Sequence, residues 1–69
     1  MTLTELRESV PMGIPELARA AGVDDQTIRN AESGQRINIK TARAIAQALS
    51  NALGHTIQVQ EIEGLQVRW

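Results

Sequence analysis

Apolar residues recur at the three- and four-residue spacing of helices in separate stretches of the 69-residue chain. The first stretch covers residues 3 to 9. Thr2 and Glu5, at its start, have the spacing of a capping box, in which a hydroxyl and a carboxylate each bond a free backbone amide. Pro11 disfavours helical geometry in the residue before it, so we predict a helix that is short.

Two further helical patterns meet at a glycine-containing turn. The first begins near Ile14, because Pro15 is tolerated only in the first turn of a helix. It ends at Gly22, because glycine adopts the positive φ of a helix end without a Cβ clash. Asp24 is a good N-cap for the second pattern, which covers residues 25 to 33. The inward positions of this second helix are apolar: Ile28 and Ala31.

The clearest periodicity in the chain lies further on and predicts a long helix over residues 39 to 53. Asn38 is a good N-cap for it, and Gly54 ends it. Residues 35 to 37, which precede this helix, are predicted to form a loop. The apolar stripe of the long helix consists of Ala42, Ile45, Ala46, Leu49, Ala52 and Leu53.

The pattern is weaker in the C-terminal tail, residues 55 to 69. Alternation favours extended structure at its start and end, and one helical turn is predicted at residues 59 to 63. Val67 and Trp69 alternate with polar neighbours, so we expect them to be exposed and to be candidate contacts of a homodimer. The alternative is that Trp69 packs back on its own core. Three tail residues are expected to close that core: Ile57, Ile62 and Leu65.

Composition limits the function classes. The formal net charge is −1, which argues against strong, indiscriminate binding to nucleic acid. There is no cysteine and only one histidine, so neither a metal site nor a cofactor is predicted, and an enzyme is disfavoured. No apolar run approaches the roughly 20 residues of a membrane span, and no signal peptide is visible. We therefore expect a cytoplasmic protein.

The central part of the chain resembles the Cro/C1-type (XRE) DNA-binding domains of phage repressors. The resemblance rests on these residues: Glu16-Leu17-Ala18, Gly22-Val23, Thr27-Ile28, Glu32, Gly34 and the stretch from Thr41 to Leu49. It implies an all-α fold, a compact bundle of four to five helices of the lambda-repressor-like type. One domain would cover residues 1 to 69, with a helix-turn-helix at about residues 14 to 33. It also implies a bacterial or phage origin.

The resemblance assigns two further features. Arg7 and Glu32 occupy positions that commonly form an ion pair in the family, and we expect this pair to orient the second helix of the motif more than to stabilise the fold. The chain departs from the family pattern at Gly13 and Ile14, where a polar residue and a glutamine are common. That glutamine often touches the DNA backbone, so this phosphate contact is in doubt here.

Double-stranded DNA is the predicted ligand, with the second helix of the motif in the major groove. Gln26 has the chemistry to bond adenine, Arg29 to grip guanine and Asp25 to accept a hydrogen bond from cytosine. Asn30, one turn further on, is expected at a base or at a flanking position. The candidate backbone contacts are Thr27, Ser33, Arg36, Asn38, Lys40 and Arg43.

Two functions from different classes follow from these residues. The first is a sequence-specific transcriptional regulator, a repressor in our interpretation, that binds its operator as a homodimer. The second is a protein-interaction module that keeps the helix-turn-helix fold but binds DNA weakly or not at all. The near-neutral charge, Asp25 and the apolar tail favour this second reading. A regulatory protein partner is compatible with both.

Overall fold

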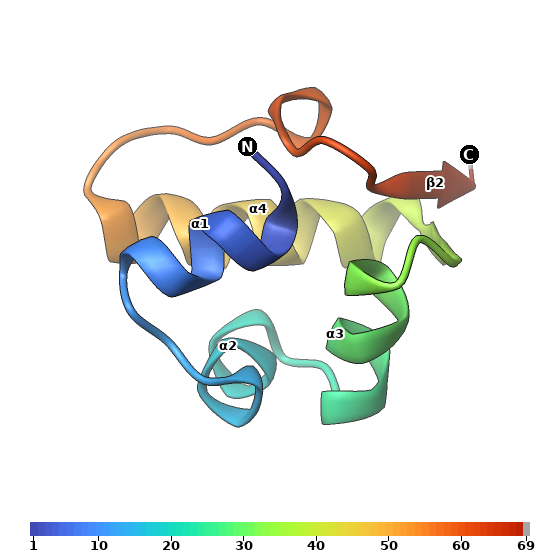
Figure 1. The fold of residues 1–69 in the computed structure, drawn as a ribbon, viewed down its shortest axis with the longest axis horizontal. Helices are drawn as coiled ribbons and strands as arrows, with labels where there is room; N and C mark the ends of the chain where they lie inside the picture. Colours follow the sequence, from blue (N-terminus) through green and yellow to red (C-terminus); the bar gives the residue numbers. More distant parts are fainter. Residues whose placement is uncertain (69) are drawn as a thin grey trace.

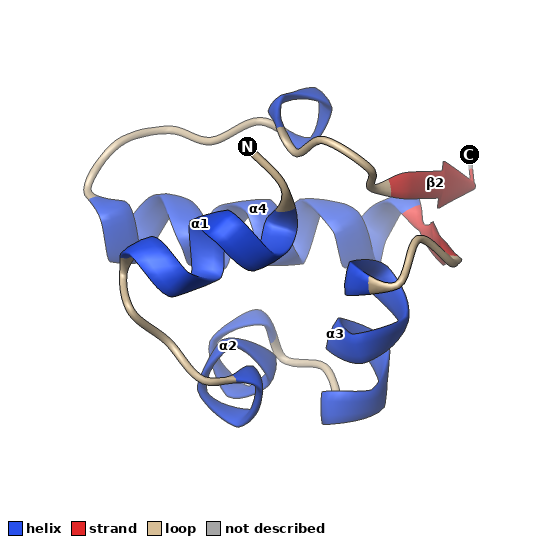
Figure 2. Cartoon of the chain, in the orientation of Figure 1, coloured by secondary structure: helices blue, strands red, loops and turns tan. Residues whose placement is uncertain are grey.

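A computed structural model describes residues 1 to 68 of the chain (Figure 1). Within them, four α-helices surround a small core, and two three-residue strands and one 3₁₀ helix complete the fold (Figure 2). In chain order the elements are α1 (Leu3–Ser9), α2 (Ile14–Ala21), α3 (Asp25–Glu32), β1 (Arg36–Asn38), α4 (Ile39–Leu53), η1 (Val59–Glu61) and β2 (Gln66–Arg68). The predicted all-α bundle is confirmed, with the strand pair as a minor addition.

The helix bounds follow the capping residues closely. The Thr2 hydroxyl accepts from Glu5 N at 3.2 Å, and the Glu5 carboxylate accepts from Thr2 N at 2.8 Å, so the predicted capping box is present. The bond that the Glu5 carboxylate accepts from the Thr2 amide holds the pKa of Glu5 below its ordinary value. Gly22 ends α2 at a φ of 73°, as predicted. The second helix of the motif ends at Glu32, one residue earlier than predicted.

The long helix α4 runs across the middle of the molecule in Figure 1, and it contacts α2, both strands and η1. Four large side chains are fully buried: Leu17 of α2, Ile28 of α3, and Ile45 and Leu49 of α4. Alanines fill much of the remaining core, and because an alanine side chain is a single methyl group, the helix axes can approach closely. The predicted stripe on α4 is therefore correct over most of its length.

One position of that stripe is wrong. Ala52 is exposed, and Ala48 is buried instead. Ala52 lies one turn beyond Ala48 on the same side of the helix, close to the end of α4 at Leu53, so burial on this side ends at Ala48. The segment that follows α4 returns along the side that carries Ser50, whose hydroxyl accepts from Ile57 N at 2.8 Å and donates to Ala46 O at 2.7 Å.

The prediction of a loop at residues 35 to 37 is also wrong, because β1 begins at Arg36. It pairs with β2 in parallel, with Ile37 opposite Val67 and Asn38 opposite Arg68. The three residues of β1 show no periodicity of their own, and the strand with which they pair is remote in the sequence. Ile37 is buried and Val67 is half-buried against the core, so the sheet turns one apolar side chain of each strand inward.

The rest of the tail agrees in part with expectation. The predicted helical turn is present as η1, and Ile62, directly after it, is buried. Ile57 and Leu65 pack against the core but stay partly exposed. Val67 is less exposed than predicted because the strand pair covers one side of it. Trp69, the other predicted dimer contact, lies outside the described residues.

Candidate nucleic-acid interface

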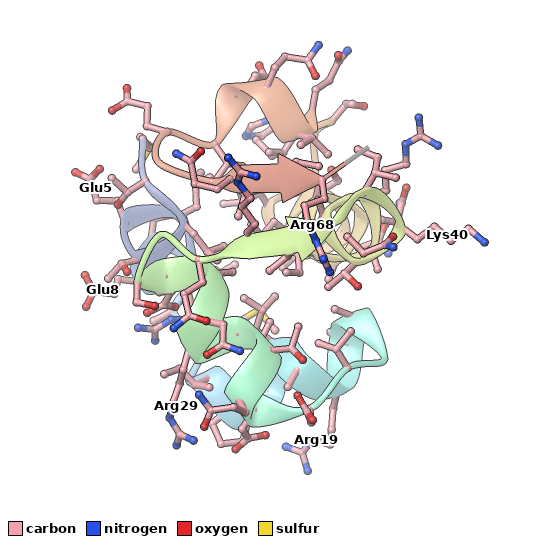
Figure 3. All side chains as sticks on the ribbon, turned by 90° about the vertical axis from the view of Figure 1, so that its right-hand side faces the viewer. Glu5, Glu8, Arg19, Arg29, Lys40 and Arg68 are labelled. Atoms are coloured by element: carbon pink, nitrogen blue, oxygen red, sulfur yellow. The ribbon has the colours of Figure 1, made fainter. Side chains whose placement is uncertain are left out.

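One face of α3 is polar and open to solvent. Gln26, Arg29 and Ser33 are exposed at the three- and four-residue spacing that places them on one side of the helix. The opposite side carries Ile28 and Ala31, which are buried against the core. Figure 3 shows Arg29 pointing away from the body of the molecule at the end that α3 occupies. The packing of its apolar side therefore leaves the polar side of α3 open to solvent.

The start of α3 is held by Asp24. Its carboxylate accepts from Thr27 N at 2.8 Å and from the Thr27 hydroxyl at 2.5 Å. The Thr27 hydroxyl and backbone hold the pKa of Asp24 below its ordinary value, so this carboxylate stays charged at neutral pH. The negative charge also interacts favourably with the positive end of the helix dipole. The hydroxyl hydrogen of Thr27, a residue predicted to contact phosphate, is therefore already bonded to Asp24.

Two of the predicted base-contact residues bond each other. Gln26 Nε2 donates to Asn30 Oδ1 at 2.9 Å, across one turn of α3. The Gln26 carbonyl oxygen and the second hydrogen on its amide nitrogen remain, and these are the acceptor and donor that adenine requires. Asn30 therefore fixes the direction of the Gln26 amide. Ser33 Oγ donates to Asn30 O at 3.0 Å, so its hydrogen is also used within the helix.

An ion pair ties the far end of α3 to α1. Arg7 Nε lies 2.6 Å from Glu32 Oε2, and the two side chains are only 15% and 14% exposed. Arg7 Nη1 also donates to Met12 O at 2.9 Å, so the guanidinium joins α1, the following loop and α3. Arg7 and Glu32 are the residues that the family resemblance pairs. Because both charges are largely removed from water, the desolvation penalty offsets much of their attraction.

The chain therefore contains, in succession, a helix that ends at Gly22, a short turn and a helix with an exposed polar face. A family model described as Helix-turn-helix matches residues 3–54, which is 52 of the 69 residues. The chain belongs to the Cro/C1-type helix-turn-helix family. This family consists of DNA-binding transcription regulators. Neither the comparison with curated proteins nor that with solved structures finds a significant match.

The two elements that follow α3 carry exposed basic side chains. Arg36 of β1 and Lys40 and Arg43 of α4 are exposed, as their predicted role requires. Asn38, between them, caps α4 by accepting from Lys40 N at 2.7 Å, which leaves its amide hydrogens open. Our prediction from sequence missed Arg68 of β2. The alternation of Gln66, Val67 and Arg68 was visible, but its strand partner was not.

The acidic residues of this helix-turn-helix protein are largely bonded within the chain. Six of the eight accept a hydrogen bond or ion pair from another described residue: Glu5, Glu16, Asp24, Glu32, Glu61 and Glu63. By contrast, Arg7 is the single lysine or arginine with an ion pair among residues 1 to 68. Six of the seven lysine and arginine side chains therefore have no ion pair among residues 1 to 68, although the net charge of the chain is −1.

Among residues 1 to 68, no group of three or more histidine, cysteine, aspartate or glutamate side chains is arranged to hold a metal ion. Within the same range, each helix is too short or too polar to cross a membrane.

The ion pair leads to a first prediction. In a double-mutant cycle of Arg7→Met and Glu32→Gln, we expect a coupling energy of about 1–3 kcal/mol, because each single variant leaves a largely buried charge without its partner. Urea unfolding of the four proteins measures it. Arg19→Met is the matched control, since Arg19 is exposed and has no partner among the described residues. We expect the control to change stability by less than about 0.5 kcal/mol. A coupling energy of zero would contradict the role of the pair.

The cap of α3 leads to a second prediction. A carboxyl with a lowered folded-state pKa stabilises the protein fully above its unfolded-state pKa, near 3.8, and loses that contribution as the pH falls through the folded value. Wild type should therefore lose stability with acid more steeply than Asp24→Asn. Thermal unfolding at a series of pH values tests this. Glu8→Gln, at an exposed carboxylate on α1, should keep the wild-type profile. Parallel profiles for wild type and Asp24→Asn would exclude the cap as the cause.

Proposed function

We propose that this protein is a sequence-specific transcriptional repressor that reads the major groove of DNA with α3. The observation that carries the proposal is the exposed line of Gln26, Arg29 and Ser33 on a helix whose other side is fixed in the core. An α-helix fits the width of the major groove, and in a helix-turn-helix the second helix enters it with its N-terminal residues nearest the bases. Membership of a DNA-binding family supports the same ligand.

The base contacts would divide between two side chains. Arg29 is exposed, has no internal partner among residues 1 to 68 and presents the fork of donors that matches guanine O6 and N7. Gln26, held by Asn30, would present its remaining acceptor and donor to adenine. Asp25 lies half-buried at the first turn, where it would accept from cytosine N4. Asn30 would act mainly through Gln26.

The backbone contacts would lie at either side of α3. Arg36, Lys40 and Arg43 supply positive charge, and the Asn38 amide supplies neutral donors. Thr27 and Ser33 would need to exchange their internal hydrogen bonds before their hydroxyls could donate to phosphate. For that reason we assign the larger part of the phosphate contacts to the basic residues.

We further propose that two copies bind a two-fold symmetric operator in the cytoplasm of a bacterium or a phage-infected cell and block transcription there. Half-sites of such operators lie about 34 Å apart, one turn of DNA. A dimer contact through Val67 would use the part of that side chain that the sheet leaves exposed. Trp69, outside the described residues, is the other candidate. A regulatory protein would act by competing for these surfaces.

Selection from a pool of random DNA duplexes tests the function as a whole. We expect enrichment of one short motif that occurs twice in inverted orientation, because two copies would read it with identical α3 surfaces. Sizing of the complex on the selected duplex should give two chains per site. Failure to enrich any motif at low salt would overturn the proposal. If the protein then copurified with a defined protein partner, the interaction-module alternative would take its place.

Variants of α3 and α4 separate base reading from charge. On the selected operator, Arg29→Ala should weaken binding by about 1–3 kcal/mol and relax the preference at one base pair, because it removes a paired guanine contact. Lys40→Ala should weaken binding to all sequences alike and reduce the salt slope by about one. Fluorescence anisotropy with single-base operator variants at several salt concentrations measures both. An Arg29→Ala protein with unchanged base preference would contradict the assignment.

A further inference from the structure

The strand β2 lies beyond the part of the chain that matches the helix-turn-helix family, which ends at residue 54. It nevertheless pairs with β1, and β1 is the segment that connects α3 to α4. The register places Arg68 opposite Asn38, the residue that caps α4. Neighbouring strands are about 4.8 Å apart, so the backbone of Arg68 lies next to the start of α4.

The outer face of the strand pair is polar. Ile37 and Val67 turn toward the core, so the residues on either side of them turn outward. These outward residues are all exposed: Arg36, Asn38, Gln66 and Arg68. Two of the four are arginines, and none is acidic. Arg68 forms no ion pair with any residue from 1 to 68, so its charge is open to an anionic partner.

The labelled side chains of Figure 3 show where Arg68 lies relative to two groups proposed to meet DNA. Figure 3 shows it at the end of β2, between Lys40 at the start of α4 and the end of the molecule where Arg29 projects. Glu5 and Glu8, on α1, lie at the opposite edge of this view. The two labelled acidic residues of α1 are therefore remote from Arg68 and Lys40 in this view.

We propose that β2 is part of the DNA-binding surface and that Arg68 contacts the phosphate backbone beside the start of α4. The inference rests on the proposed function, since it assumes that α3 lies in the groove. An arginine suits this position because its planar fork binds phosphate oxygens in pairs. Pairing with β2 also holds β1 in place, so the same strand positions Arg36. The tail therefore supplies one phosphate contact directly and orders a second.

The test compares the full-length protein with Arg68→Gln on the selected operator. We expect the slope of log affinity against log salt to become shallower by about 0.9, and the affinity at 0.15 M salt to fall about fivefold, which is the effect of one lost phosphate contact. The preference for individual base pairs should not change. Arg68→Lys should keep the wild-type slope, because it keeps the charge.

Two controls exclude other causes. Gln66→Ala changes an exposed residue of the same strand without changing its charge, so we expect it to keep the wild-type slope. If this variant lost as much affinity and slope as Arg68→Gln, β2 would act only by ordering β1. That result would overturn the proposed phosphate contact. Glu8→Gln changes the net charge by one unit on α1. A gain in affinity with it as large as the loss with Arg68→Gln would mean that only net charge matters, which would also overturn it.

The outcomes separate this inference from the function on which it rests. If Arg68→Gln binds like wild type while Arg36→Gln and Lys40→Ala lose affinity and slope, the protein reads DNA without β2 and the inference is wrong. If wild type itself selects no DNA, the proposed function fails first. A shallower slope for Arg68→Gln, with unchanged thermal stability and base preference, would establish the contact.

Discussion

The close packing of α2 against α4 is the interaction on which the rest of the structure depends. A chain of this size has little apolar surface to bury and no cysteine with which to supplement it. The core meets this limit with a few fully buried large side chains, Leu17, Ile45 and Leu49 among them, set between alanines. The helix α3 contacts α2, and α1 contacts α3. The position of the exposed face of α3 therefore depends on the packing of α2 against α4.

Such a core contains no buried polar side chain among residues 1 to 68, so the polar groups at the helix starts must be satisfied at the surface. Acidic residues do much of this: Glu5, Glu16 and Glu61 each accept from a backbone amide three residues earlier, and Asp24 from one three residues later. A carboxylate bonded at a helix start has its charge partly offset by the amides it faces. The fold thus uses four of its eight acidic residues for capping, while six of its seven lysine and arginine side chains are exposed and form no ion pair among residues 1 to 68.

The sequence predicted the helices well because their signals are local. Thr2, Pro15, Asp24 and Asn38 mark four helix starts, and each acts through neighbours within three residues. The strand pair escaped prediction for the opposite reason. Ile37 belongs to a strand because it pairs with Val67, which lies far along the chain. No pattern inside either three-residue segment indicates the other segment.

The same distinction applies to the candidate site. The exposed positions of Gln26 and Arg29 followed from helical spacing, whereas the bond between Gln26 and Asn30, although compatible with that spacing, is a matter of rotamers. The proximity of Arg68 to Asn38 could not be predicted, because it arises only when the tail has folded. Sequence therefore predicts which residues face outward from one element, and tertiary structure decides which elements face the same way.

This division bears on how the protein would combine specificity with affinity. The residues proposed to read bases lie on one helix inside the family-matched region, where Asn30 bonds Gln26 and the Arg7–Glu32 pair ties the far end of the helix to α1. The residues proposed to hold phosphates lie around β1, whose pairing with β2 depends on the buried Ile62 and on the return of the chain along α4. Substitutions in the tail would change the phosphate contacts while α3 kept its direction, so the strength of binding can vary separately from the sequence that is bound.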